Sequence, residues 1–279
     1  KSSNNKLKCI LAEDFKIQNF SLTEIDIKND KGNKNQMMCF PRYGENNCVF
    51  QTPEFTLSQY GLAPIGEYAK SDEDYQRKML KLPLDPNQPG CQRLEQMFTS
   101  VDSKMEKDRK KIFSNPKLAK IEKTYKYKSI VRSPLVQDDL IDDEEGEDKT
   151  KDAGEKKEKF KFWKAKLDVD YNTGKITTSV FVKDSENPKA RGKRVPVETP
   201  TQLEKLLTWG STVKFMVMCN KMWADKNVKG EEKTRGYGLG FKILSMEILP
   251  RERVGSYRDE VQEYAFIDTN DNSGNETTT

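Results

Sequence analysis

Two long runs of alternating apolar and polar residues near the end of the chain constrain its fold more than any other feature. They cover 213–223 and 237–249, and a loop rich in Lys and Gly, 225–236, lies between them. Successive side chains of a strand point to opposite faces, so a period of two predicts strands with one buried face. Both runs are longer than an ordinary strand of about 5–6 residues, so the sequence predicts a sheet built around this pair.

Shorter patterns precede this pair. Residues 160–169 and 175–183 alternate in the same way, and 171–174 ends in a Gly that can adopt a left-handed conformation, which predicts a hairpin. Thr199 offers a hydroxyl cap before Pro200, and Gly210 follows the last apolar position, which predicts a short helix between them. The last third of the chain therefore reads strand, strand, helix, strand, strand.

The first half mixes short apolar runs with one helical pattern. Residues 91–113 carry apolar side chains three and four positions apart, which predicts a helix that ends before Pro116. Residues 77–84 predict a strand, and residues 121–131 alternate as a strand rich in lysine. The predicted fold class is mostly β with a minor helical part.

Charge divides the chain further. Eight of the eleven residues 138–148 are acidic, and 259–279 contain six acidic residues and no basic one. Segments this charged lack the apolar residues of a core. We therefore predict four parts: an N-terminal β/α part, 1–136, that contributes to the same barrel as the C-terminal strands; an acidic disordered linker, 137–158; a core β-β-α-β-β part, 159–250; and an acidic tail, 251–279.

Composition excludes most kinds of catalysis. The chain has no histidine, so it cannot form a Ser-His or Cys-His pair or use the commonest zinc ligand. Its five cysteines include no C-x-x-C pair, and phosphate-binding and nucleophile-elbow motifs are absent. No run approaches the roughly 18 apolar residues of a membrane span. These observations predict a soluble, non-catalytic protein with no metal and no cofactor.

Aromatic residues alternate with lysine on the predicted hairpin. Phe160, Phe162, Lys164 and Lys166 share one face of the first strand, and Phe181 and Lys183 share the corresponding face of the second. Phe beside Lys on an exposed face is typical of single-strand binding, in which each stacked base contributes roughly 1–3 kcal/mol. The alternative is that this face forms a second core layer under the N-terminal half.

A second cluster surrounds the loop between the two longest strands. It includes Lys221, Trp223 and several lysines of the loop, and loops of this kind flank the groove of an oligonucleotide-binding (OB) barrel. The alternative is a solvated loop with Trp223 in the core. The predicted stacking residues are Phe160, Phe162, Phe181 and Trp223, and the predicted phosphate contacts are Lys126, Lys128, Lys164, Lys166, Lys183, Arg191, Lys193 and Arg194.

Several short motifs resemble a known family. These are the sequences of 208–215 (TWGSTVKF), 220–223 (NKMW) and 237–244 (YGLGFKIL), together with 50–53 (FQTP), Tyr60-Gly61 and 82–85 (LPLD). They resemble OB-fold single-stranded-DNA-binding proteins of podovirus-type phages and of large DNA viruses. The resemblance implies a five-stranded OB-type barrel with an N-terminal elaboration and a short helix between strands.

The resemblance also implies a role. A member of this family coats single-stranded DNA during viral DNA replication or recombination, and its acidic tail competes with DNA for the groove and contacts viral replication proteins. The implied partners are single-stranded DNA or RNA, replication proteins and other copies of the chain, without a membrane. The implied location is the viral replication site in the host cytoplasm or nucleus, or the virion.

Two other functions are compatible with the residues. A virion structural or scaffolding protein could use the same barrel for contacts with acidic proteins, and a nuclease would need carboxylates that converge on a cleft. If competing oligo-dT dissociates a purified complex, DNA binding is favoured over the structural or scaffolding role. The acidic run 138–148 is the only dense carboxylate cluster, and a flexible run of this kind is typically solvated.

Overall fold

The fold is mostly β with a minor helical part, as predicted. It is seen in a computed structural model that describes residues 8–28, 35–66, 69–134, 159–184, 186–187 and 189–250. The predicted acidic linker 137–158 and tail 251–279 lie outside the described residues. No helix in the described part of the chain has the length and apolar character needed to cross a membrane.

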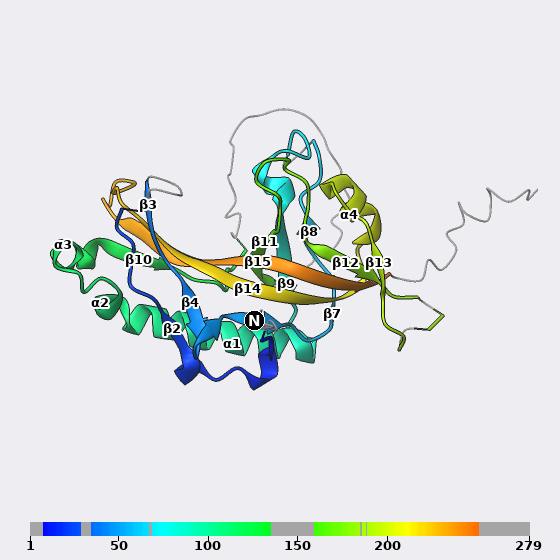
Figure 1. Cartoon of the computed structure of the whole chain (residues 1–279), viewed down its shortest axis with the longest axis horizontal. Coiled ribbons are helices and arrows are strands. Elements are labelled where there is room, and N and C mark those ends of the chain that lie inside the picture. Colours follow the sequence, from blue (N-terminus) through cyan, green and yellow to red (C-terminus); the bar gives the residue numbers. More distant parts are fainter. Residues whose placement is uncertain are drawn as a thin grey trace, which may run out of the picture.

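The two longest strands form the centre of the sheet (Figure 1). β14 (Thr212–Asp225) and β15 (Arg235–Leu249) pair antiparallel over nearly their whole length, with register shifts at Met216/Val217 and Cys219/Lys221. Both strands and the loop between them agree with the prediction from alternation.

Shorter strands extend the sheet on both sides of this pair. On the β14 side, the strands are β1 (Ile10–Leu11), β3 (Gln36–Cys39), β6 (Val49–Gln51) and β7 (Phe55–Thr56). On the β15 side, they are β8 (Gly61–Leu62), β9 (Met79–Leu84), β10 (Tyr125–Lys128), β11 (Lys161–Leu167), β12 (Ser179–Val182) and β13 (Lys193–Val195). Strands from both halves of the chain therefore share one sheet.

The sheet does not close into a five-stranded barrel. β7 pairs with β14 and β8 pairs with β9, so residues 55–62 reach from one side of the sheet to the other. Residues 57–60 between these two strands form no ladder, because the chain bends there and Tyr60 takes a left-handed φ of 66°. At this point the two sides of the sheet are connected by the covalent chain and not by backbone hydrogen bonds between strands.

One long helix covers one face of the sheet (Figure 1). α1 (Pro89–Lys107) buries the apolar positions predicted from its three-and-four spacing. Its Phe98 lies 5.0 Å from the ring of Trp163 and 5.6 Å from that of Phe241, measured between centroids. Trp163, Ala165 and Leu167 of β11 are all buried on this side, so alternate residues of the same strand must face the opposite side.

The remaining elements are short. After α1 come α2 (Arg109–Ile112), α3 (Pro116–Ala119) and the 3₁₀ turn η4 (Glu122–Thr124). A small separate sheet is formed by β2 (Phe20–Leu22), β4 (Pro41–Tyr43) and β5 (Asn46–Asn47), and the other 3₁₀ turns are η1 (Ala12–Asp14), η2 (Ile17–Asn19) and η3 (Tyr75–Lys78). The predicted short helix is α4 (Pro200–Leu206), which Thr199 caps through a reciprocal pair of hydrogen bonds with Gln202.

Three local predictions need correction. Pro116 begins α3 instead of only ending a helix, since its missing N–H is not needed in a first turn. The strand predicted over 121–131 is limited to β10, because η4 occupies its first part. The hairpin predicted from 160–183 contains only one bridge, Val169 with Ile176. β11 and β12 instead each pair with β15, one after the other along its length.

We expect Gly90→Ala to destabilise the protein, although alanine is the better helix former by about 1 kcal/mol. A Cβ at this second position of α1 would lie 2.5 Å from the backbone oxygen of Glu54 and 3.1 Å from the Cβ of Pro53. Neither neighbour is a flexible side chain, so the first turn of α1 must move. Overpacking of this kind costs typically 1–3 kcal/mol. Urea unfolding should show a net loss, and a gain in stability would contradict the close approach.

Candidate nucleic-acid interface

The side of the sheet opposite α1 carries a continuous set of cationic side chains, which we call the basic face. Lys164 and Lys166 of β11 alternate with the buried positions of that strand and so point away from α1. Lys81 of β9 lies directly across from Lys164, and Lys242 of β15 lies directly across from Lys166. The basic face consists of Lys78, Lys81, Lys126, Lys128, Arg132, Lys164, Lys166, Lys221 and Lys242.

These cations are mutually destabilising. Burial lowers the pKa of Lys81, and the positive charges of Lys164 and Lys159 lower it further. Burial also lowers the pKa of Lys164 and Lys166, with additional repulsion from Arg132 in the first case and from Lys221, Lys78 and Lys242 in the second. Like charges directly opposite on neighbouring strands destabilise a sheet.

Little negative charge compensates this repulsion. Lys242 pairs with Asp168 at 2.9 Å, and Lys126 pairs with Glu232. The other cations of the basic face form no ion pair with any carboxylate in the described part of the chain. A rigid sheet that holds unpaired cations side by side is suited to bind a polyanion.

Aromatic rings lie among these cations. The rings of Tyr60 and Phe162 contact each other, with centroids 5.3 Å apart, and the Lys81 ammonium packs against both, with its Nζ 3.9 Å from each centroid. Lys166 lies over the ring of Tyr75, with its Nζ 5.4 Å from the centroid, and 58% of Tyr75 is exposed. The cations and rings therefore lie within contact distance, as stacking of bases and neutralisation of phosphates would require.

Phe162 is less accessible than the alternation suggested, since only 8% of it is exposed. Tyr60 and Lys81 cover its outer side, and the Tyr60 ring is held there by two features. Its left-handed backbone turns the side chain toward β11, and its hydroxyl donates a 2.7 Å hydrogen bond to the carbonyl oxygen of Phe160. A base can stack on Phe162 only after both the Tyr60 ring and the Lys81 ammonium move aside.

Trp223 lies on the same side of the sheet at the other end of the basic face. It is half-buried, and its ring lies against Gly236 and Gly238, where an added Cβ would lie 3.4 Å and 3.2 Å from ring carbons. Lys128 pairs with Gly238, so its side chain emerges beside this ring. Gly236 and Gly238 therefore allow this ring to approach the backbone of β15 closely.

The structure brings together only part of the predicted site. Phe162, Lys164, Lys166, Trp223, Lys126 and Lys128 share the outer side of the sheet, and Phe160 lies at the start of β11 with its backbone bound by Gln59 and Tyr60. The other predicted residues, Phe181, Lys183, Arg191, Lys193 and Arg194, lie on or beside β12 and β13. Phe181 pairs with Glu247, five positions along β15 beyond the partner of Lys166.

Lys183 is already neutralised. Its Nζ lies 3.4 Å from carboxylate oxygens of both Glu54 and Glu247, and the same two carboxylates bind Lys214. Sequence spacing could not show this cluster, because its members come from four distant segments. Arg191, Lys193 and Arg194 are exposed, and Arg194 lies directly across from Phe181 on the β12–β13 pair.

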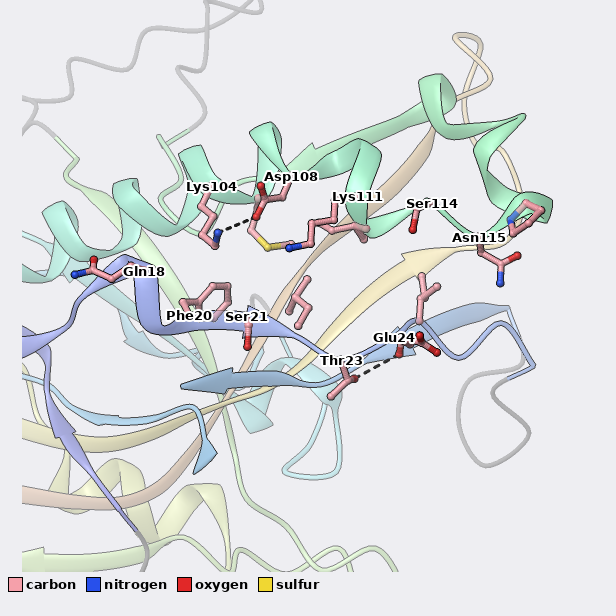
Figure 2. A pocket seen from close by; sticks show the side chains of 15 residues that line it. Gln18, Phe20, Ser21, Thr23, Glu24, Lys104, Asp108, Lys111, Ser114 and Asn115 are labelled. Atoms are coloured by element: carbon pink, nitrogen blue, oxygen red, sulfur yellow. Dashed lines mark hydrogen bonds and ion pairs between the residues drawn. The ribbon is translucent and has the colours of Figure 1, made fainter. Parts of the chain in front are cut away.

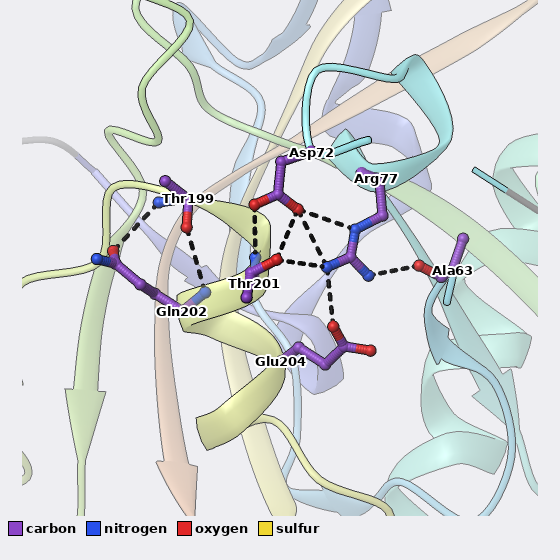
Figure 3. A network of polar contacts seen from close by, with 7 residues as sticks. All are labelled: Ala63, Asp72, Arg77, Thr199, Thr201, Gln202 and Glu204. Atoms are coloured by element: carbon purple, nitrogen blue, oxygen red, sulfur yellow. Dashed lines mark hydrogen bonds and ion pairs between the residues drawn. The ribbon is translucent and has the colours of Figure 1, made fainter. Parts of the chain in front are cut away.

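The loop that presents Tyr75 and Lys78 is fixed by a buried arginine (Figure 3). Arg77 is fully buried, and its guanidinium bonds to Asp72, to Glu204 at 2.8 Å and to the carbonyl oxygen of Ala63 at 2.6 Å. Asp72 also accepts hydrogen bonds from the backbone and hydroxyl of Thr201. The loop before β9 is thereby tied to α4.

Sequence reasoning missed six members of this site: Tyr60, Tyr75, Lys78, Lys81, Arg132 and Lys242. Tyr60 lies in an irregular segment and Tyr75 begins the short 3₁₀ turn η3, so no period indicates the direction of either side chain. Lys81 and Lys242 did have a detectable signal, because each interrupts an apolar strand at an outward position. Their strands were predicted, but their adjacency to β11 was not.

A separate groove of about 650 Å³ lies on the helical side of the sheet (Figure 2). It runs between β2 and the elements α1, α2 and α3, and Lys104 and Asp108 form an ion pair on its rim. Within the described ranges, no group of three or more Cys, Asp or Glu side chains is arranged to hold a metal ion.

Comparison with known proteins gives three findings. No protein-family model matches the chain. The chain is 28% identical over 221 residues to an uncharacterized protein of Acanthamoeba polyphaga mimivirus; the match covers 74% of this chain, which spans about half the length (52%) of that relative. Among solved structures, it is similar to the single-stranded DNA-binding protein encoded by bacteriophage T7, with 14% identity and a TM-score of 0.32, over 83% of this chain and all of that one.

Proposed function

We propose that this protein binds single-stranded DNA on the basic face, without catalysis. The observation that carries the proposal is the row of unpaired, mutually repelling lysines around Tyr60, Phe162 and Tyr75. Phosphates would relieve the repulsion that adds to burial in lowering the lysine pKa values, and the rings would stack bases without reading their sequence.

The strand order supports an OB-type site. The segment from β6 to β8 pairs with β14 at one end and with β9 at the other. β9 pairs in turn with β11, and β11 runs parallel to β15. β15 pairs with β14, which returns the order to its start. We propose that this ring is an elaborated OB-type barrel. Its second and third strands are then β9 and β11, and that face together with the loops before β9 and after β14 is where OB folds bind oligonucleotides.

The mimivirus relative supports a viral protein, and the resemblance noted in the sequence supports a place in viral DNA replication or recombination. In that role the protein would coat single strands at the replication site of the host cell. Replication proteins and further copies of the chain are the partners that such a role requires.

The test is a salt titration of binding to oligo-dT and to a duplex of the same length. We expect tighter binding to the single strand, with log K falling against log salt at a slope of about −0.7 for each neutralised phosphate. Equal affinity for duplex, or no dependence on salt, would show that the basic face has another use. Binding of an acidic protein with no DNA affinity would favour the scaffolding alternative.

A further inference from the structure

A second group of unpaired cations lies beyond the end of the basic face, on residues 109–124, which we call the helical arm. It contains α2, α3 and η4, with six basic side chains against one acidic side chain, Glu122. Arg109 pairs with Glu122. The other five, Lys110, Lys111, Lys117, Lys120 and Lys123, are exposed and form no ion pair with a carboxylate of the described residues.

The helical arm is held in place from inside. Phe113 is fully buried and stacks on Tyr125, with centroids 3.9 Å apart and planes 8° apart, and it also meets the edge of Tyr237. Leu118 is buried, and Asn115 caps α3 by accepting a hydrogen bond from the backbone of Lys117. The five lysines are therefore presented on a fixed scaffold instead of a flexible chain.

The arm is continuous with the basic face. β10 begins immediately after η4, and its Lys126 and Lys128 pair with Gly236 and Gly238 beside Trp223. Figure 1 draws α2, α3 and β10 at the same end of the molecule. Arg132 bridges Phe162, and Lys123, the last lysine of the arm, lies nine positions before Arg132, at most about 30 Å away at about 3.3 Å per residue.

The chemistry of the arm differs from that of the basic face. Phe113 is its one aromatic residue, and that ring is buried, so the arm offers cations with no surface on which a base could stack. Lysines at the opposite end of the sheet, in contrast, are neutralised by Glu54 and Glu247. A fixed array of cations without rings is suited to phosphates alone.

We propose that the helical arm is a second nucleic-acid subsite, which binds the phosphate backbone of a single strand as the strand leaves the basic face past Trp223. This inference rests on the proposed function. It predicts two classes of ligand: a short strand that occupies only the basic face, and a longer strand that reaches the arm as well.

The test uses the variant Lys117→Gln/Lys120→Gln/Lys123→Gln and two lengths of oligo-dT. Lengths of about 6 and about 30 nucleotides lie inside and well beyond the roughly 4–16 nucleotide site of one OB fold. We expect affinity for the long strand at low salt to fall by about tenfold or more, and its salt slope to become less steep by about 2. Affinity for the short strand should stay within about twofold, since the arm is not reached.

Two controls make the test specific. Lys8→Gln/Lys16→Gln/Lys205→Gln removes the same charge from exposed positions outside both surfaces and should leave both affinities unchanged. Lys117→Arg/Lys120→Arg/Lys123→Arg should retain long-strand binding. The melting temperature of the glutamine variant should be equal to or above that of the original protein, because repulsion within the arm is relieved.

The outcomes separate the two proposals. If the arm variant binds the long strand with unchanged affinity, the second subsite is overturned. The same result is expected if the arm is instead a site for an acidic protein. An equal loss for both lengths, or an equal loss in the control, would also overturn it. If the original protein binds neither length, the proposed function itself fails, and the subsite with it.

Discussion

Replacing Lys164 and Lys166 together with glutamine is expected to lower affinity for single-stranded DNA on the order of 100-fold or more at low salt. Each charge-assisted contact with a phosphate contributes about 1.5–3 kcal/mol, and about 1.4 kcal/mol corresponds to tenfold in affinity. The salt slope should become less steep by about 1.4, since two phosphate contacts are lost. Fluorescence anisotropy with labelled oligo-dT over a salt series measures both quantities.

The same substitution should leave the fold intact or slightly stabilise it. The pKa values of both lysines are lowered in the folded protein by burial and by neighbouring cations, so their charged forms oppose folding at neutral pH. This opposition is present below the lowered pKa values and is relieved as pH rises through them, so neutralising the side chains should not reduce the melting temperature at pH 7. If the variant loses its fold as well as its binding, the two lysines are structural residues and not phosphate contacts.

Lys8→Gln/Lys16→Gln is the matched control, with the same change in net charge at exposed positions away from the basic face. It should change affinity by less than about threefold, because exposed charges farther than a Debye length of about 10 Å are screened. Equal losses in the two variants would show that net charge, rather than the basic face, governs binding.

Asp72→Ala is expected to have the largest effect on stability among single changes at the site, about 3–5 kcal/mol, because it leaves the fully buried Arg77 short of a countercharge. Arg77→Met should cost less, since the side chains of Asp72 and Glu204 are 28% and 46% exposed and can be hydrated. Chemical denaturation measures both. The surface pair Lys175–Glu198, in which both side chains are 57% exposed, supplies a control, Glu198→Ala, that should cost less than about 1 kcal/mol.

The Asp72 contact also has a pH signature. Burial alone would raise the pKa of Asp72, but hydrogen bonds from Thr201 and Arg77 outweigh it, and the carboxyl pKa lies below its ordinary value. Its contribution to stability is therefore present above the ordinary pKa of about 3.9 and is lost as pH falls through the lowered value. The difference in unfolding free energy between the original protein and Asp72→Ala should shrink below about pH 4. A difference that is constant across this range would contradict the network.

Loosening this network should affect binding as well. Arg77 and Asp72 touch none of the exposed rings, yet they fix the loop that places Tyr75 over Lys166 and Lys78 nearby. Asp72→Ala, measured under conditions where it is folded, should weaken DNA binding with little change in salt slope, since no cation is removed. An unchanged affinity would mean that the loop does not contribute.

Local patterns predicted local structure well. The alternation of β14 and β15, the three-and-four spacing of α1 and the Thr199-Pro200 start of α4 are signals carried by neighbouring residues, and each element formed where it was predicted, although the helix predicted over 91–113 is divided at Asp108 into α1 and α2. Pairing between distant strands left no such signal. The predicted hairpin of β11 with β12 was therefore wrong, and with it the expectation that Phe181 lies near Phe162.

The same limit explains which residues of the site could be predicted from the sequence. Lys164, Lys166 and Trp223 could be predicted because their strands alternate, which fixes the face of each side chain. Tyr60 and Tyr75 could not, since a single left-handed residue and a buried Arg77 place them, and neither is periodic. Neutralisation of Lys183 depends on Glu54 and Glu247, which only the assembled sheet brings close.

The shared sheet has a consequence for how the protein forms. β3 pairs with β14, and Gln36 bonds to Asp225 across 189 positions of sequence, while β9 pairs with β11 only after the intervening segment has been made. Contacts this distant make the search for the native pairing slow. During synthesis, β9 waits for β11, while β6 and β7 keep an unpaired edge until β14, which with β15 is the last described strand pair to appear. Newly made chains should therefore need a chaperone, or rapid release and completion, to escape aggregation.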